Sequence, residues 1–141
     1  MSALSFRLAA AFVLAGVPYA GTAADIYPFE GSSWRIASIN GESTPSSRYM
    51  ISFGGNQVTG RVGCNDFGGK LVAGESTLSV ADLRATSRNC GDTAALLEGS
   101  AFAVLSQPLR MVWASRDQLT IASSEGSMTL ERMRLATTPP R

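Results

Sequence analysis

The sequence contains no histidine, one lysine and two cysteines among its 141 residues. The absence of histidine excludes Ser-His-Asp and Cys-His catalytic groups, and it removes the commonest general base and metal ligand. Three enzymatic routes would remain. These are a serine activated by Lys70, a cysteine nucleophile with a lowered pKa, and a pair of carboxylates.

None of these three routes has a supporting pattern. Lys70 follows a glycine pair that is typical of a turn, and the two cysteines are each other's natural partners. The spacing of the acidic residues places no two of them on one wall of a site; the candidates are Asp66, Asp82, Asp92 and Glu98. We therefore predict that the chain is not an enzyme and uses no cofactor.

The chain also lacks an excess of positive charge. Once Arg7 is removed with the segment described next, 11 basic residues face 11 acidic ones. A nucleic-acid-binding domain is expected to carry a basic excess. We therefore predict no nucleic-acid partner.

Long apolar runs are absent except at the N-terminus, where an uncharged run of 13 residues extends from Leu8 to Ala20. It follows one positive charge, Arg7, and precedes the small residues Gly21 to Ala24, which is the pattern of a secretory signal peptide. The alternative is an uncleaved membrane anchor, but a spanning helix needs about 20 apolar residues. We predict a signal peptide over residues 1–24, cleaved after Ala23 or Ala24. The mature chain is then periplasmic or secreted and has no transmembrane segment.

The two cysteines are Cys64 and Cys90, and both lie in the mature chain. An even number in an exported chain favours a disulfide. Two buried thiols and a metal pair are the alternatives. Metal is the weakest of the three, because two thiolates without histidine do not complete a zinc site.

Most of the mature chain reads as short strands separated by turn residues such as Asn40-Gly41. We expect Gly60 to mark a bulge or tight bend within one strand, and the glycine-rich stretch 63–69 to form a corner. The large aromatic residues Trp34, Phe53, Phe67 and Trp113 are expected in the core. The eight predicted strands cover residues 34–39, 49–53, 57–62, 70–73, 77–83, 109–114, 118–122 and 127–132.

One helix is predicted from Thr93 to Ser106, capped by Asp92 or Thr93 and ended by Pro108. Glu98 falls on its apolar face, where an unpaired carboxylate would be costly. Our hypothesis is a partly buried ion pair of Glu98 with Arg84 or Arg88. A Glu98 that faces a ligand is the alternative.

About eight short strands with one helix predict a mainly β protein, an antiparallel barrel or sandwich. The domain is expected over residues 31–134. Residues 25–30 read as a linker, and residues 135–141 as a disordered tail.

The ordered motifs of this chain resemble the META domain family over residues 31–134. The most specific part is a Gly-Cys-Asn triplet followed at fixed distances by an aromatic residue, a glycine, a threonine and a second cysteine. Flanking matches are Gly31 to Trp34 and Leu130 to Arg132. The motif residues are Gly63, Cys64, Asn65, Phe67, Gly69, Thr86 and Cys90. Leu71 departs from the pattern, because the family usually has an aromatic residue there.

The resemblance implies a small lipocalin-like antiparallel β-barrel with one helix packed on it. It also implies a connection with envelope stress, but no known biochemical activity. Asn65 and Thr86 have a structural reading, as hydrogen-bonding residues of a corner, which we prefer to a ligand-binding one.

The function we predict is a non-catalytic binding or stabilising role in the envelope. The expected form is a monomer, and the expected partner an envelope protein or a small apolar ligand, held in an apolar cavity at one end of the barrel. The alternative is an inhibitor of a secreted enzyme such as lysozyme, acting through an exposed loop at 44–48 or 74–77.

Overall fold

The computed structural model describes residues 30–45 and 48–134. The predicted signal peptide, most of the linker and the C-terminal tail lie outside the described residues. Within them the chain forms nine strands and one helix, so the mainly β prediction is confirmed. Their bounds are β1 Ser32–Ile39, β2 Glu42–Ser43, β3 Met50–Gly54, β4 Gln57–Val62, β5 Asn65–Ala73, β6 Leu78–Ala85, α1 Asp92–Leu105, β7 Arg110–Ser115, β8 Gln118–Ser123 and β9 Gly126–Arg132.

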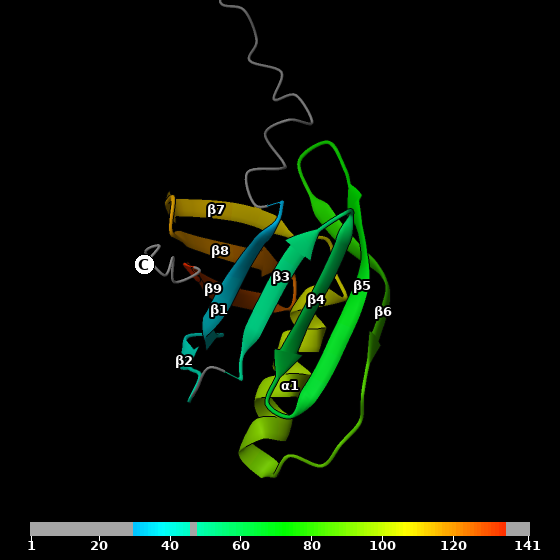
Figure 1. The fold of residues 1–141 in the computed structure, drawn as a ribbon, viewed down its shortest axis with the longest axis vertical. Helices are drawn as coiled ribbons and strands as arrows, with labels where there is room; N and C mark the ends of the chain where they lie inside the picture. Colours follow the sequence, from blue (N-terminus) through cyan, green and yellow to red (C-terminus); the bar gives the residue numbers. More distant parts are fainter. Residues whose placement is uncertain (1–29, 46–47, 135–141) are drawn as a thin grey trace, which may run out of the picture.

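The strands form one antiparallel sheet that curves into a half-barrel (Figure 1). The order across the sheet is β6-β5-β4-β3-β1-β9-β8-β7, and the short β2 pairs with β1 beside this path. Strand β1 therefore joins an N-terminal group, β3 to β6, to a C-terminal group, β7 to β9. Most neighbours are connected by tight turns, in agreement with the turn signals in the sequence.

The two outer strands of the sheet, β6 and β7, meet at a single point. Leu78 at the start of β6 and Leu109 just before β7 form an isolated bridge, with N···O distances of 2.7 and 2.9 Å in the two directions. Beyond this bridge the described residues show no ladder between the two strands. The two edges of the half-barrel are thus joined by one residue pair and not by a continuous ladder of hydrogen bonds.

Helix α1 lies against the concave side of the half-barrel and contacts strands of both groups, among them β4, β6, β8 and β9 (Figure 1). Its buried side chains are Leu97, Ala101, Val104 and Leu105. Gly91 occupies the N-cap position with φ +90°, and no side chain caps the helix. The predicted cap at Asp92 or Thr93 is therefore wrong, because the glycine conformation turns the chain into the helix directly.

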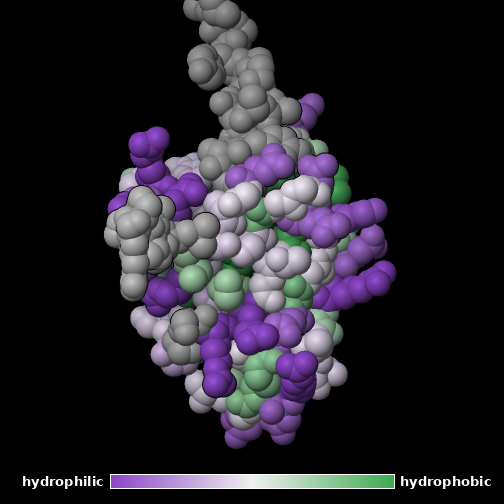
Figure 2. All heavy atoms as spheres, viewed as in Figure 1, coloured by the Kyte–Doolittle hydropathy of each residue, from purple (hydrophilic) through white to green (hydrophobic). Residues whose placement is uncertain are grey.

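The core fills the space between the sheet and the helix. Period-two alternation places Trp34, Ile36, Leu119 and Leu130 on the inner face, and each is fully buried. The outer face of the N-terminal group is mostly polar, and hydrophilic residues gather along its β5 and β6 edge (Figure 2). Among the described residues no helix is long and apolar enough to cross a membrane.

The glycine-rich stretch is not the corner that the sequence predicted. The turn is confined to Gly63 and Cys64, and β5 begins at Asn65 and continues through Gly68 and Gly69. A bulge lies here, where the register with β6 shifts between Gly68 and Lys70. A β-carbon on Gly69 would approach Val80 Cγ1 to 2.5 Å, so the glycine lets β6 pack closely.

The prediction for Gly60 is also corrected. Its register with β3 and β5 is unbroken, and Phe67 lies directly opposite it. A β-carbon at this position would lie 2.6 Å from the Phe67 ring and would collide with the carbonyl oxygen of Met50. Gly60 therefore makes room for an aromatic ring rather than marking a bulge.

Candidate functional site

The predicted disulfide is present, and it joins the β4–β5 turn to the segment that enters α1. The α-carbons of Cys64 and Cys90 are 5.6 Å apart, within the usual range. Gly63 precedes Cys64 with φ +64°, and a β-carbon on it would lie 3.3 Å from Ala94 of the helix. The turn is therefore held against the first turn of α1.

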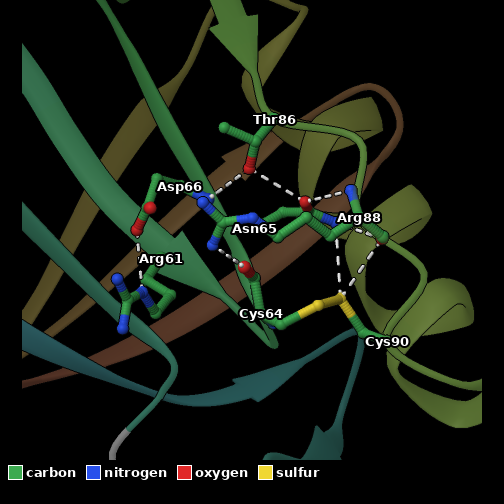
Figure 3. Close-up of polar contacts among 7 residues, drawn as sticks. All are labelled: Arg61, Cys64, Asn65, Asp66, Thr86, Arg88 and Cys90. Carbon is green, nitrogen blue, oxygen red and sulfur yellow. Dashed lines mark hydrogen bonds and ion pairs between the residues drawn. A yellow bond between two sulfur atoms is a disulfide. The ribbon is translucent and has the colours of Figure 1, made fainter.

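Asn65 is the centre of the hydrogen bonding around this disulfide, and it is completely buried (Figure 3). Its Nδ2 donates to the carbonyl oxygen of Arg88 at 3.0 Å and to Glu98 Oε2 at 2.7 Å, and contacts Cys90 Sγ at 3.4 Å. Its Oδ1 accepts from Thr86 Oγ1 at 2.9 Å and from the Arg88 amide at 2.7 Å. One amide side chain thus ties together β5, the 86–90 segment and the helix.

Thr86 and Asp66 extend this network to the outer face. Thr86 Oγ1 accepts from the Asp66 amide at 3.0 Å, and the Asp66 carbonyl accepts from the Thr86 amide at 2.9 Å. The Asp66 carboxylate accepts from Arg61 Nε at 2.7 Å. This hydrogen bond lowers the pKa of Asp66, helped by the charges of Arg61 and Arg88 and opposed by desolvation.

Glu98 has a different partner from the one we hypothesised. Among the described residues neither Arg84 nor Arg88 forms an ion pair with it. Arg88 instead directs Nη1 to the Cys64 carbonyl oxygen at 3.3 Å, and Arg84 borders a shallow depression elsewhere, with Lys70 and Asp82. The Asn65 amide satisfies the carboxylate, so the predicted ion pair is replaced by a charge-assisted hydrogen bond.

The remaining motif residues support the core around this network. Phe67 is buried, and its ring meets Phe102 of α1 edge to face with 5.8 Å between centroids. Tyr49 lies close to the motif, and burial, followed by the charge of Glu98, raises the pKa of its phenol. The Asn65 side chain thus links the disulfide loop, the sheet and the helix through hydrogen bonds.

A second region has the character of a binding site, and it lies beside Trp34, near the start of β1. Here a hollow of about 850 Å³ is lined by Trp113, Ser115, Arg116, Asp117, Arg132 and Arg134. These residues come from β7, the β7–β8 turn, β9 and the residues just after β9. Ligand pockets in proteins have this size and often lie in the mouths of β-barrels.

Strand alternation directs two of these side chains inward. Arg132 pairs with Trp34 across β9 and β1, and Trp113 pairs with the buried Leu119 across β7 and β8. The Trp113 and Trp34 rings meet edge to face at 5.7 Å, and the Arg132 guanidinium lies 4.3 Å from the centroid of the Trp34 ring. Trp34 is fully buried, but Trp113 is 36 % exposed, so the prediction that Trp113 is a core residue is wrong.

Sequence reasoning missed this second region. The sequence did contain an indication of it. Alternation along the two predicted strands places Trp113 and Arg132 on the inner face of the sheet. An inward arginine near a strand end indicates a barrel mouth rather than a filled core, since arginine is almost never fully buried without a partner. The proximity of β7 and β9 to Trp34, however, depends on the sheet order, which the sequence pattern does not give.

Comparison with known proteins places the chain in a family. Residues 27–136 match the META domain. A solved NMR structure has a TM-score of 0.62 at 21% sequence identity, covering 73% of this chain and 90% of that one. An NMR structure of a protein from Burkholderia xenovorans has a TM-score of 0.63 at 16% identity, covering 93% and 100%. The similarity to these two solved structures establishes the fold alone. A search of curated proteins found no match. Because the META domain model matches most of its length, the chain belongs to the META domain family.

Proposed function

We propose that this META domain protein is exported and acts in the envelope as a non-catalytic binding protein that holds a small ligand in the hollow beside Trp113. The observation that carries the proposal is the hollow itself, which combines an exposed aromatic ring with arginine side chains. Binding pockets typically join apolar contact area to a few polar groups that orient the ligand. A role in the response to envelope stress is part of the proposal.

The disulfide and the hydrogen bonds around it support this proposal, because they stabilise the domain without using any residue that lines the hollow. Cys64–Cys90 and Asn65 hold the β4–β5 turn to α1, so the sheet that carries the hollow is braced against the helix. A disulfide also suits an oxidising compartment. A rigid scaffold lowers the entropic cost of binding, since fewer groups are ordered when the ligand arrives.

The experiment is native mass spectrometry of the protein recovered from its own compartment, followed by extraction of whatever it carries. We expect a mature chain that begins near Asp25 and carries a bound small molecule. Trp113→Ala should lose that molecule. Val112→Ala is the matched control, because Val112 is 61 % exposed on the other face of the same strand. Equal occupancy in both variants, or none in the parent protein, would contradict the proposal.

Inhibition of a secreted enzyme such as lysozyme is the second candidate function. The observation in its favour is the β5–β6 loop, where the Gly74 amide donates to the Thr77 carbonyl oxygen at 2.8 Å and Glu75 is exposed. A closed loop of this kind could enter an active site. An inhibition assay of the mature protein against several lysozymes tests this function, and no inhibition of any of them would exclude lysozyme as the target.

A further inference from the structure

The charges around the hollow narrow the class of ligand. The hollow is bordered by three arginines, Arg116, Arg132 and Arg134, and by one aspartate, Asp117. We infer that it takes a small amphipathic anion, with an apolar body against Trp113 and a carboxylate, sulfonate or phosphate group at the arginines. This inference rests on the proposed function and specifies its ligand.

Asp117 holds the side chains of two of the arginines in place, and its single negative charge does not neutralise all three. Its carboxylate lies 2.7 Å from Arg134 Nη2 and 3.6 Å from Arg132 Nε. Arg132 Nε also donates to the Arg116 carbonyl oxygen at 3.0 Å. Among the described residues, the Arg132 side chain makes no other hydrogen bond, so its two Nη groups remain available in a fixed orientation. A guanidinium held in this way suits the planar, bidentate recognition of an oxyanion.

Arg116 adds a positive charge that is not matched nearby. Within the part of the chain that the structure describes, its guanidinium forms no ion pair. Arg132 is only partly accessible, with 27 % of its side chain exposed. A neutral apolar ligand would take it further out of water without compensation, which is costly. An anionic ligand would supply the missing charge, and the surplus of arginine would attract it.

The Trp113 ring defines the other half of the ligand. It forms a wall of the hollow and meets the Trp34 ring edge to face, while the Arg132 guanidinium lies over the Trp34 ring. A flat or extended apolar group can stack there with little ordering cost. The anionic group and the apolar body would therefore bind to different residues, which makes their contributions separable.

The test uses two fluorescent probes with the same apolar body, 8-anilino-1-naphthalenesulfonate and the uncharged N-phenyl-1-naphthylamine. Each is titrated into the oxidised mature protein, from which bound material has first been extracted. We expect the sulfonate to bind about tenfold more tightly than the neutral probe. Displacement of the sulfonate by 2-naphthoate or by dodecanoate then tells whether an aromatic acid or a fatty acid is the better source of this chemistry.

Variants assign the two halves of the ligand. Arg116→Gln and Arg134→Gln should each weaken sulfonate binding by about three- to tenfold and leave the neutral probe nearly unaffected. Trp113→Ala should weaken both probes. Arg110→Gln is the control, because Arg110 is an exposed arginine on the outer face of β7. Melting curves verify that every variant is folded.

Equal affinity for the two probes would overturn the inference, and so would equal losses in the Arg110 and Arg116 variants. If both probes bind equally and depend on Trp113, a ligand site exists but selects no anion, and the proposed function survives. If neither probe binds, the inference also fails. The mass-spectrometric test then decides separately whether the proposed function is correct.

Discussion

Asn65 donates a 2.7 Å hydrogen bond to Glu98, which lies 33 residues further along the chain. This contact joins the start of β5 to the middle of α1. It also solves the problem posed by an acidic residue on the inner side of a helix, because a charge-assisted hydrogen bond replaces the lost hydration. The five predictions that follow start from this contact and from the strands and helix that it joins.

Asn65→Ala should destabilise the protein by about 2–3 kcal/mol, because several buried donors and acceptors would lose their partner at once. Asn65→Asp should cost at least as much at pH 7, since it places a second carboxylate beside Glu98. That deficit should shrink near pH 5, because a carboxylate pair with a raised pKa stabilises as protons are taken up. Urea unfolding at the two pH values measures both effects. An Asn65→Asp deficit that does not change with pH would contradict this assignment.

Glu98→Gln should lower stability by only about 1 kcal/mol, because glutamine keeps an acceptor for Asn65 and loses only the charge assistance. Glu98→Ala should cost more. An ion pair with Arg84 would predict instead that Arg84→Ala and Glu98→Gln are not additive in a double-mutant cycle. We expect those two changes to be additive, as judged from urea midpoints.

The disulfide should contribute about 3–4 kcal/mol, since it closes a loop of 27 residues between Cys64 and Cys90. Cys64→Ser combined with Cys90→Ser should reproduce the midpoint of the reduced parent protein in urea. The measurement is chemical unfolding with and without a reductant. A double variant as stable as the oxidised parent would show that the bridge adds nothing to stability.

The phenol of Tyr49 should ionise above the usual pH of about 10, because burial and then the charge of Glu98 disfavour the phenolate. A folded-state pKa above the unfolded value stabilises fully below pH 10, and this contribution is lost as the pH rises through the folded pKa. In the mature chain with Tyr27→Phe, Tyr49 is the only tyrosine, so ultraviolet absorbance follows it alone. Adding Glu98→Gln should lower its pKa, while burial keeps it above the ordinary value. A Tyr49 that titrates normally would contradict both causes.

Gly60→Ala should destabilise by about 2–3 kcal/mol, since the new methyl group meets the Phe67 ring and a backbone carbonyl. Gly99→Ala is the matched control. Gly99 lies in α1 with open space around it, and the change should stabilise by about 0.5–1 kcal/mol through helix propensity. Thermal melts of the two variants should therefore shift in opposite directions.

The sequence predicted local structure well where the pattern was strictly alternating. β1, β4 and β8 follow the alternation closely, and the helix was placed within one residue at each end. It failed at glycines, because a glycine that admits a neighbouring ring, such as Gly60, looks the same in sequence as one that turns the chain. The contact that explains Gly60 lies on another strand.

The candidate sites were likewise predicted in part. The disulfide between Cys64 and Cys90 was predicted and is present, and Asn65 makes hydrogen bonds beside it to Thr86 and Arg88. The partner of Glu98 and the exposure of Trp113 could not be predicted. The partner of Glu98 depends on where α1 packs against the start of β5. The surroundings of Trp113 depend on which strands are neighbours in the sheet, an order that brings together residues as distant in sequence as Trp34 and Arg132.

The single Leu78–Leu109 bridge between β6 and β7 has a mechanical consequence. A closed barrel has a fixed circumference, because every strand is hydrogen-bonded to a neighbour on both sides. In the described part of this chain one residue pair joins β6 to β7, and α1, which contacts both groups of strands, is the other link between them on this side. We therefore expect the amides of β7 to exchange with solvent sooner than those of β1, which is paired with strands on both sides.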